Sequence, residues 1–338
     1  MKILLGMSGG LDSSYAAHVL KNEGHEVVGA VLKMHRYTET DSAKKAAEEI
    51  GIPLVEIDCA ERFERDVVEP FCLEYLAART PNPCIFCNPS VKFGVMCEYA
   101  ALNGFDRVST GHYCKIVERD GRYAIARADD GKKDQSYVLW GLRQDQLKIL
   151  YFPLFGASKE DVRKDARLIG LSSADAKESQ EICFIPDNDY ASFIEARYGK
   201  MPEGDFISPE GKACGRHRGL LHYTVGQRKG LGIALGRPVF ISRMDTAENR
   251  IYLADAGGEF TESASVTHLN FQLCAPFEGE IEAFAKMRYA ATPARSRIKI
   301  ENGRAEVRFD SPSRAVTPGQ SAVFYDDNGA ILFGGLIV

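Results

Sequence analysis

A glycine- and serine-rich stretch, GMSGGLDSS at residues 6–14, separates the first apolar run of the chain from its first helical pattern. The run before it, KILLGM, is short and apolar. The residues after it place Ala16, Val19 and Leu20 on one helical face. A turn between a strand and a helix presents backbone N–H groups and the positive end of the helix, which together attract an anion. The stretch therefore predicts an α/β domain with a phosphate-binding loop in its first turn.

The rest of the first 112 residues keeps the same alternation of apolar runs and helical patterns. HEVVGAVLK, PLVEID and RVSTGH are typical of strands, whereas residues 41–51, 62–79 and 91–102 carry helical spacing. A further amphipathic helix is predicted at 159–171. This alternation predicts an open parallel α/β sheet covered by helices.

The alternation of apolar runs and helical patterns ends near residue 187. From residue 204 onward glycines punctuate short apolar runs, a pattern that indicates β-hairpins and turns. The letters DDNG at 326–329 are a strong hairpin signal among short alternating segments. We therefore predict an α/β domain at 1–187, a small central domain at 188–245 and an all-β barrel domain at 246–338.

Composition and charge narrow the class of protein. With 338 residues and a hydrophobic content of 45%, the chain is long enough for two or three ordinary globular domains. The net charge of −5 does not point to nucleic acid, although the basic stretches GRHRG and GQRKG, with His222 and Tyr223 between them, would suit RNA. No apolar run approaches the roughly 18 residues of a membrane helix, and the first apolar run is too short for a signal-peptide core. We expect a cytoplasmic protein with no membrane partner.

Nine cysteines are scattered along the chain, and two of them form a pair in TPNPCIFCN, residues 80–88. An odd number without a secretory signal argues against a disulfide framework. The pair Cys84 and Cys87 fits half of a zinc site, a redox disulfide or part of an active site, and its spacing alone leaves all three open. Zinc is the weakest of these, because a structural zinc site needs four ligands and no second pair has a fitting spacing.

The loop at residues 6–14 has the composition of a nucleotide site. Gly9 and Gly10 let the backbone approach phosphates, and Asp12 can cap the helix or hold Mg²⁺. The loop matches neither the dinucleotide-binding pattern nor the Walker pattern, whose lysine is missing. A simple Gly/Ser turn with a capping aspartate is the alternative. The full pattern S-G-G-x-D-S-S instead resembles the PP-loop of ATP pyrophosphatases, which cleave ATP between its α and β phosphates.

Six further segments resemble one family of that superfamily, the bacterial tRNA-specific 2-thiouridylases. They are RTPNPCIFCNPSVKFG (79–94), STGHY (109–113), KKDQSYVLWGL (132–142), SQEICFIPD (179–187), HYTVGQRKGLGI (222–233) and TPGQSAVFY (317–325). The resemblance covers nearly the whole chain and implies a PP-loop domain, a small central domain and a β-barrel. It also implies an enzyme that adenylates the 2-oxygen of the tRNA wobble uridine with ATP. Sulfur from a cysteine persulfide would then replace that oxygen, with release of AMP and pyrophosphate.

The resemblance assigns a nucleotide site and a catalytic pair. It implies that Cys183 carries the sulfur as a persulfide, and that Cys87 assists the transfer and can close a disulfide with Cys183. Leu32 would meet the adenine through its backbone, and Gly111 would border the nucleotide. The implied ATP-binding positions are Gly6, Met7, Ser8, Gly9, Gly10, Leu11, Asp12, Ser13, Leu32 and Gly111.

The family's tRNA contacts also map onto this sequence. Asn82, Pro83 and Cys84 match positions that line the target base. The other matching positions are His112, Lys133, Asp134, Gln135, Arg288, Tyr289 and Gln320. The implied partners are a persulfide sulfur-relay donor protein and tRNAs with a thiolated wobble uridine, such as those for lysine, glutamate and glutamine. A monomer is expected.

Two features depart from the family pattern. The segment MHRYTETDS, residues 34–42, replaces a longer acidic segment, which leaves the details of adenine or tRNA recognition open. Cys84 stands where many relatives have aspartate, and with Cys87 and Cys183 it would supply three thiolates for a [4Fe–4S] cluster. No other bound metal centre is expected. Two other functions stay open: an argininosuccinate-synthetase-like PP-loop amidoligase acting on a small metabolite, and a tRNA-binding paralogue without catalysis.

Overall fold

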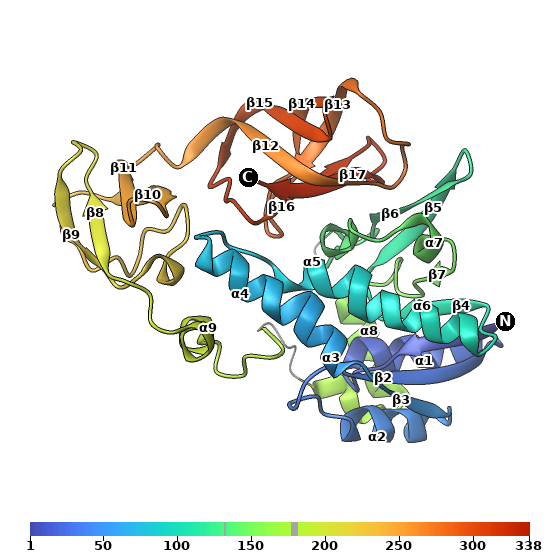
Figure 1. Cartoon of the computed structure of the whole chain (residues 1–338). Coiled ribbons are helices and arrows are strands. Elements are labelled where there is room, and N and C mark those ends of the chain that lie inside the picture. Colours follow the sequence, from blue (N-terminus) through green and yellow to red (C-terminus); the bar gives the residue numbers. More distant parts are fainter. Residues whose placement is uncertain (132, 177–181) are drawn as a thin grey trace.

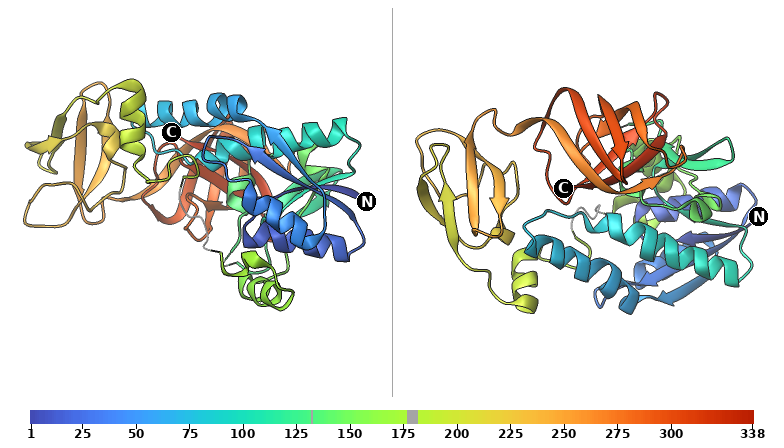
Figure 2. Two further views of the ribbon diagram at one scale, coloured as in Figure 1. Left: turned by 90° about the horizontal axis from the view of Figure 1, so that it is seen from below. Right: turned by 45° about the horizontal axis from the view of Figure 1, so that its top comes forward.

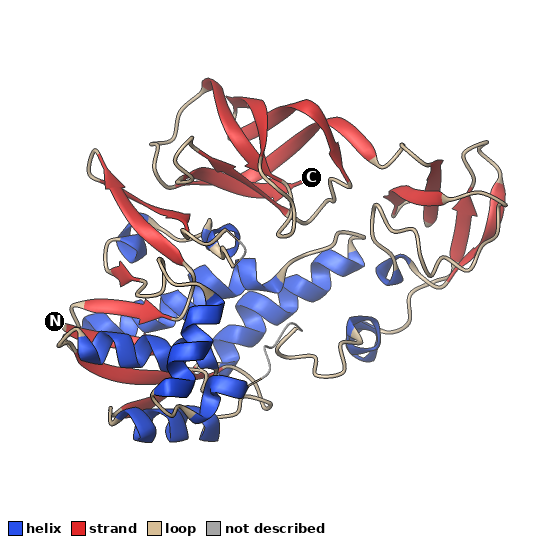
Figure 3. Cartoon of the chain, turned by 180° about the vertical axis from the view of Figure 1, so that it is seen from behind, coloured by secondary structure: helices blue, strands red, loops and turns tan. Residues whose placement is uncertain are grey.

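The computed structural model describes residues 1–131, 133–176 and 182–338. Lys132 and residues 179–181, which belong to two of the motifs above, lie outside this described part. An α/β region, a small β-sheet region and a closed barrel follow one another along the chain (Figure 1). The small sheet lies at the end of the molecule away from the N-terminus (Figures 2 and 3).

A five-stranded parallel sheet in the order β3-β2-β1-β4-β7 forms the base of the α/β region. The order in which the chain adds strands to the sheet reverses at β1, which has β2 on one side and β4 on the other. Ligands of such sheets bind outside the carboxyl ends of the strands at this reversal. The strands are β1 (Lys2–Gly6), β2 (Glu26–Lys33), β3 (Leu54–Asp58), β4 (Arg107–Thr110) and β7 (Leu150–Tyr151).

Helices cover both faces of this sheet. Ile3 and Leu5 of β1 pack into one core, and Leu4 packs into the core on the opposite face. The predicted parallel α/β sheet is thereby confirmed. The helices that contribute to the core of Ile3 and Leu5 are α1 (Leu11–Asn22), α2 (Asp41–Ile50) and α8 (Lys159–Leu168).

The helices on the Leu4 face are interrupted by π-helical turns. The first runs as α3 (Ala60–Phe63), η1 (Glu64–Val68) and α4 (Glu69–Leu76). The second runs as α5 (Pro83–Cys87), η2 (Asn88–Lys92) and α6 (Phe93–Leu102). The prediction began this second helix at residue 91, which left the cysteine pair outside it. That was wrong because Asn82 caps the helix, accepting from the Cys84 N–H at 3.0 Å, and Pro83 occupies its first position.

Short elements connect the sheet to the rest of the molecule. The hairpin of β5 and β6 extends toward the barrel, where Ala126 pairs with Ala330. These connecting elements are β5 (Cys114–Arg119), β6 (Arg122–Arg127), η3 (Ser136–Leu139), α7 (Gln144–Leu147), η4 (Ser172–Asp175) and α9 (Tyr190–Tyr198).

The small central region is a four-stranded sheet in the order β10-β11-β8-β9. Strand β11 lies beyond residue 245, where the sequence analysis placed a domain boundary. It nevertheless pairs with both β10 and β8 of this sheet. The exact domain limits stay a prediction. The elements are β8 (Gly204–Ile207), β9 (Ala213–His217), η5 (Leu220–His222), β10 (Val239–Asp245) and β11 (Arg250–Asp255).

The C-terminal region is the predicted all-β barrel, closed in the order β12-β15-β14-β13-β16-β17. The DDNG letters form the turn between β16 and β17, where the Gly329 N–H donates to the Asp326 carbonyl at 3.0 Å. Within the described residues, no helix is long and apolar enough to span a membrane. The strands are β12 (Phe260–Phe271), β13 (Gly279–Lys286), β14 (Ala294–Glu301), β15 (Arg304–Arg314), β16 (Ser321–Tyr325) and β17 (Ile331–Ile337).

The barrel packs on the α/β region through η3 and the residues after it. Trp140 Nε1 donates to Ser321 Oγ at 2.8 Å, and the Tyr137 hydroxyl donates to the Ser321 carbonyl at 2.8 Å. Gly334 faces the Trp140 ring so closely that an added Cβ would lie 2.8 Å from ring atoms. These buried contacts hold the barrel beside the segment that follows β6.

Candidate active site

A cavity of about 480 Å³ opens at the carboxyl edge of the parallel sheet. The loops after β1, β2 and β4 all line it, because parallel strands end at the same edge. Of the ten predicted ATP positions, seven line the cavity: Gly6, Met7, Ser8, Asp12, Ser13, Leu32 and Gly111. The side chain of Leu11 lies instead in the core against the sheet. Gly9 and Gly10 do not line the cavity within the described residues.

The first turn of α1 has the arrangement of an anion site. Gly10 precedes the helix and offers no side-chain cap to its first N–H groups, which remain available to an anion. Ser13 Oγ and Ser14 Oγ each donate to the Gly10 carbonyl at 3.0 Å, and Ser13 Oγ also accepts from the Ser8 N–H at 3.2 Å. These bonds hold the loop closed beneath the cavity.

Asp12 does not cap α1, which was one of its two predicted roles. Its Oδ1 accepts from the Tyr113 hydroxyl at 2.6 Å and from Lys159 Nζ at 2.5 Å. Within the described part of the chain its Oδ2 accepts no hydrogen bond, and the residue lines the cavity. A carboxylate oxygen at the phosphate loop fits the other predicted role, which is to hold Mg²⁺.

Three cysteines converge near this cavity, although Cys183 is far from the other two in sequence. Cys183 lines the cavity and is exposed, Cys84 is exposed, and Cys87 is buried. All three are free thiols. The pKa of the Cys87 thiol is raised to about 12, mainly by burial; Lys92 opposes this rise, and the charges of Cys84 and Cys183 contribute to it. Although the Cys183 side chain is exposed in the cavity, desolvation by the surrounding protein raises its pKa, with a contribution from Cys84. The three sulfurs therefore lie within electrostatic reach of one another.

The difference in burial predicts an order of thiol reactivity. We expect iodoacetamide at pH 8 to label Cys84 and Cys183 well before Cys87, because a thiol of pKa about 12 is ionised in only about 10⁻⁴ of molecules at that pH. Peptide mapping by mass spectrometry would measure the three rates, with guanidinium-unfolded protein as the control in which they converge. Equal labelling of Cys87 and Cys84 in the folded protein would contradict the burial of Cys87.

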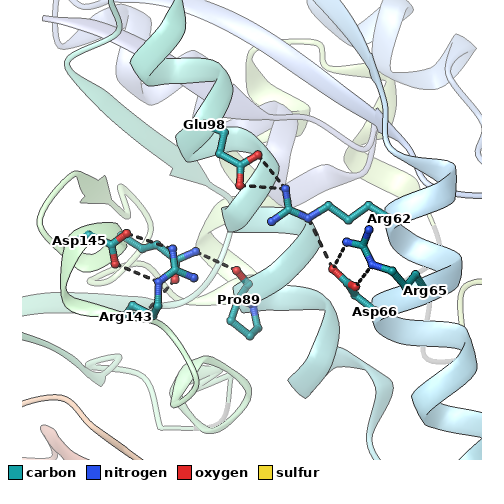
Figure 4. Close-up of polar contacts among 8 residues, drawn as sticks. Arg62, Arg65, Asp66, Pro89, Glu98, Arg143 and Asp145 are labelled. Atoms are coloured by element: carbon teal, nitrogen blue, oxygen red, sulfur yellow. Dashed lines mark hydrogen bonds and ion pairs between the residues drawn. The ribbon is translucent and has the colours of Figure 1, made fainter.

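The helix that carries Cys87 is fastened on several sides (Figure 4). Arg62 donates to both carboxylate oxygens of Glu98 at 2.9 and 2.7 Å, which joins the first helix to α6. The Pro89 carbonyl accepts from Gln146 Nε2 at 2.8 Å, and Asn88 Nδ2 donates to the Val138 carbonyl at 2.8 Å. Bonds from three separate elements thus position η2 and the cysteine before it.

The predicted tRNA positions lie in several parts of the structure. Asn82, Pro83 and Cys84 form the start of α5, where Asn82 and Pro83 are half-buried and Cys84 is exposed. Arg288 and Tyr289 lie on the partly exposed turn after β13, whereas His112 and Gln135 line the cavity. Lys133 is half-buried.

Asp134 differs from the other predicted tRNA positions. Its carboxylate is buried, accepts from Ser136 Oγ at 3.0 Å and pairs with Arg127 Nε at 3.3 Å. Lys286 Nζ of the barrel lies 3.9 Å away. In this arrangement a tRNA contact at position 134 would come from the backbone. The carboxylate itself holds the barrel to the α/β region.

Gln320 joins the barrel to the cysteine-bearing segment. Its Nε2 donates to the Thr80 carbonyl at 2.6 Å, and the Thr80 N–H donates to the Pro318 carbonyl at 2.9 Å. Gly319 permits this approach, since an added Cβ would lie 2.8 Å from the Thr80 nitrogen. The segment before α5 is therefore held against the barrel.

Loss of the hydrogen bond from Gln320 to the Thr80 carbonyl should affect the use of tRNA more than the use of ATP. We expect Gln320→Leu to lower the free energy of unfolding by about 1 kcal/mol and to lower kcat/KM for tRNA, with KM for ATP unchanged. Chemical denaturation and steady-state kinetics would measure the three quantities. A rise in KM for ATP as large as the loss with tRNA would contradict this role, because Gln320 does not line the nucleotide cavity.

The iron–sulfur hypothesis does not fit the arrangement of the thiols. Within residues 1–131, 133–176 and 182–338, no three His, Cys, Asp or Glu side chains are grouped so that they could hold a metal ion. Cys87 lies beneath the surface, whereas Cys84 and Cys183 are exposed. The three thiols are therefore not arranged as the ligands of an iron–sulfur cluster.

Several residues of the cavity were not predicted. Residues 34, 35 and 37–39 line it, from the segment that departs from the family pattern. Lys159, at the start of α8, reaches Asp12. Lys92 also lines the cavity, and it stands in the same motif as Cys87 and close to it in sequence. A helix running from Cys87 through Lys92 would have indicated that both residues belong to one site, but the predicted helix began only at residue 91.

Comparison with known proteins covers the whole chain. Residues 1–187 match the family description "tRNA methyl transferase HUP domain", residues 191–255 "tRNA methyl transferase PRC-barrel domain" and residues 262–337 "Aminomethyltransferase beta-barrel domain". The tRNA-specific 2-thiouridylase MnmA of Clostridium acetobutylicum is 41% identical over 353 residues, covering 100% of this chain and 99% of that protein. Its namesake from Clostridium botulinum strain Alaska E43 is 40% identical over 353 residues, covering 100% and 97%. The chain therefore belongs to the MnmA family of tRNA-specific 2-thiouridylases.

Proposed function

We propose that the protein converts the wobble uridine of tRNA to 2-thiouridine, with ATP as the activating substrate. The observation that carries this proposal is that Cys183 and the phosphate loop line one cavity. Full-length relatives named tRNA-specific 2-thiouridylases support the choice of tRNA as the substrate. The proposed tRNAs are those with a thiolated wobble uridine, such as the tRNAs for lysine, glutamate and glutamine.

In the first step the phosphate loop binds ATP at the N-terminus of α1. The uracil 2-oxygen attacks the α-phosphate, an O–P bond forms, and pyrophosphate leaves. Asp12 would hold the Mg²⁺ that accompanies ATP, through the oxygen that does not bind Lys159. Such an ion, when bound, neutralises charge on the departing pyrophosphate. The loop contributes backbone N–H groups that bind and orient the phosphates.

In the second step Cys183 transfers sulfur. Its persulfide, loaded by a donor protein, attacks C2 of the adenylated uridine through the terminal sulfur, and AMP leaves with the former 2-oxygen. The Cys87 thiolate then attacks the Cys183 sulfur, which breaks the S–S bond and leaves a thiocarbonyl on the base. The product disulfide joins Cys87 to Cys183, and a dithiol reductant reopens it. The burial of Cys87 supports a late role, because burial disfavours its thiolate.

The target base is proposed to enter beside Asn82, Pro83 and Cys84, at the start of α5. Chemistry on a base requires that it leave its stack. The barrel and Gln320 hold this segment in place. Lys133, Gln135, Arg288 and Tyr289 are proposed as further contacts to the tRNA.

One assay separates this function from the alternatives. The protein is incubated with tRNA, Mg-ATP and a persulfide donor, and AMP, pyrophosphate and 2-thiouridine are measured. Formation of all three is expected. AMP without a thiolated nucleoside would point to an amidoligase or another adenylating enzyme, and no turnover would point to a tRNA-binding paralogue.

A further inference from the structure

Lys92 stands out among the residues that line the cavity. It ends η2, which directly follows Cys87, and its side chain is half-buried. It lines the same cavity as Cys183 and the phosphate loop. Within the described residues no carboxylate lies at ion-pair distance from its ammonium group. A partly buried cation without a protein counter-ion is costly unless an anion of the reaction pairs with it.

The other basic side chains of the cavity lining do not supply this charge. Among the described lining residues these are His35 and His112. Burial lowers the pKa of His35, and burial together with the charge of Lys92 lowers the pKa of His112 well below its usual value. Both imidazoles are therefore neutral near pH 7. Lys159, outside the lining set, already pairs with Asp12.

The charge of Lys92 reaches both sulfurs of the proposed reaction. Burial raises the pKa of Cys87 and of Cys183, and Lys92 opposes the effect at each of them. The further ionisable groups around Cys183 and the cavity are Asp12, Tyr37, Glu39 and Cys84. None of these adds a positive charge.

We propose that Lys92 is the residue that stabilises the sulfur anion on Cys183 during its attack on the activated base. This inference rests on the proposed function and adds a residue to it. The attacking sulfur must be anionic, yet its surroundings disfavour charge. An opposite charge close to such a group lowers its pKa by about 1 unit or more. Lys92 acts on the reacting sulfur, so it should matter more for sulfur transfer than for adenylation.

Alkylation of Cys183 tests the proposal without tRNA or ATP. The full-length protein is treated with iodoacetamide from pH 6 to 10, and peptide mapping follows Cys183 separately from Cys84 and Cys87. Lys92→Met should raise the midpoint of Cys183 alkylation by about 1 pH unit, whereas Lys92→Arg should keep it near that of the unchanged protein. Lys115→Met is the matched control, because Lys115 is half-buried but pairs with Asp129 outside the cavity.

Kinetics supply the second measurement. In Lys92→Met the single-turnover rate of sulfur transfer should fall about tenfold or more, a larger factor than any change in tRNA-dependent ATP–pyrophosphate exchange or in KM for ATP. Lys92→Arg should restore most of the transfer rate. An unchanged alkylation midpoint in Lys92→Met, or a raised KM for ATP as its main defect, would overturn the proposal. If the unchanged protein makes no 2-thiouridine, the proposed function fails, and the alkylation midpoints still report the charge at Cys183.

Discussion

Cys183→Ser is expected to abolish 2-thiouridine formation while ATP is still activated. A serine hydroxyl cannot carry a persulfide, so thiolation should fall by about 10³-fold or more. The phosphate loop and Asp12, which line the cavity together with Cys183, are unchanged in this variant. We therefore expect ATP–pyrophosphate exchange with tRNA to continue. Nucleoside analysis of the tRNA and radiolabelled pyrophosphate exchange would measure the two steps separately.

Cys87→Ser should stop the reaction one step later. Without the Cys87 thiolate, the tRNA should remain joined to Cys183 through a disulfide-linked sulfur that added dithiothreitol releases as 2-thiouridine. Cys214→Ser is the matched control, because Cys214 is half-buried in the central sheet and its sulfur contacts the Phe206 carbonyl at 3.5 Å, a bond that serine can keep. Retained thiolation in Cys183→Ser would contradict the assignment of the sulfur carrier.

The alternation of strands and helices predicted the sheet, because each of these elements is determined by residues that are neighbours in the sequence. Apolar runs such as KILLG become buried strands, and the loop after β1 lies at the point where the strand order reverses. The start of α5 could not be predicted in the same way. Pro83 and Asn82 occur in turns as readily as at helix starts, and only the bond from Asn82 to the Cys84 N–H distinguishes the two.

The candidate site shows the same division between local and tertiary causes. The phosphate loop could be predicted, since its residues are contiguous. The different exposure of Cys84 and Cys87 follows from packing against distant elements, such as the bond from Asn88 to the Val138 carbonyl. Asp134 was predicted as a tRNA contact, but its carboxylate is buried beside Arg127 and Lys286. Residues that meet only in the fold leave no spacing signal in the sequence.

Gly9→Ala is expected to displace the phosphate loop and to lower kcat/KM for ATP by about 100-fold, the size of effect that a misplacement of about 1 Å produces. Gly9 adopts φ +75°, which favours glycine. A Cβ at this position would also lie 2.4 Å from the Cβ and the carbonyl carbon of Ser42, at the start of α2. The loop or the helix must therefore move. ATP titration and steady-state kinetics would measure the loss.

Gly24→Ala separates the effect of backbone strain at a positive φ from the effect of the steric clash that an added Cβ causes at Gly9. Gly24 has φ +82°, but an added Cβ would meet no atom within 4 Å. This control should lose about 1 kcal/mol of unfolding free energy from backbone strain alone and keep its affinity for ATP. Gly9→Ala should lose at least as much stability and, in addition, its ATP affinity. If the two variants bound ATP equally well, the close packing of Gly9 on α2 would not be what positions the phosphate loop.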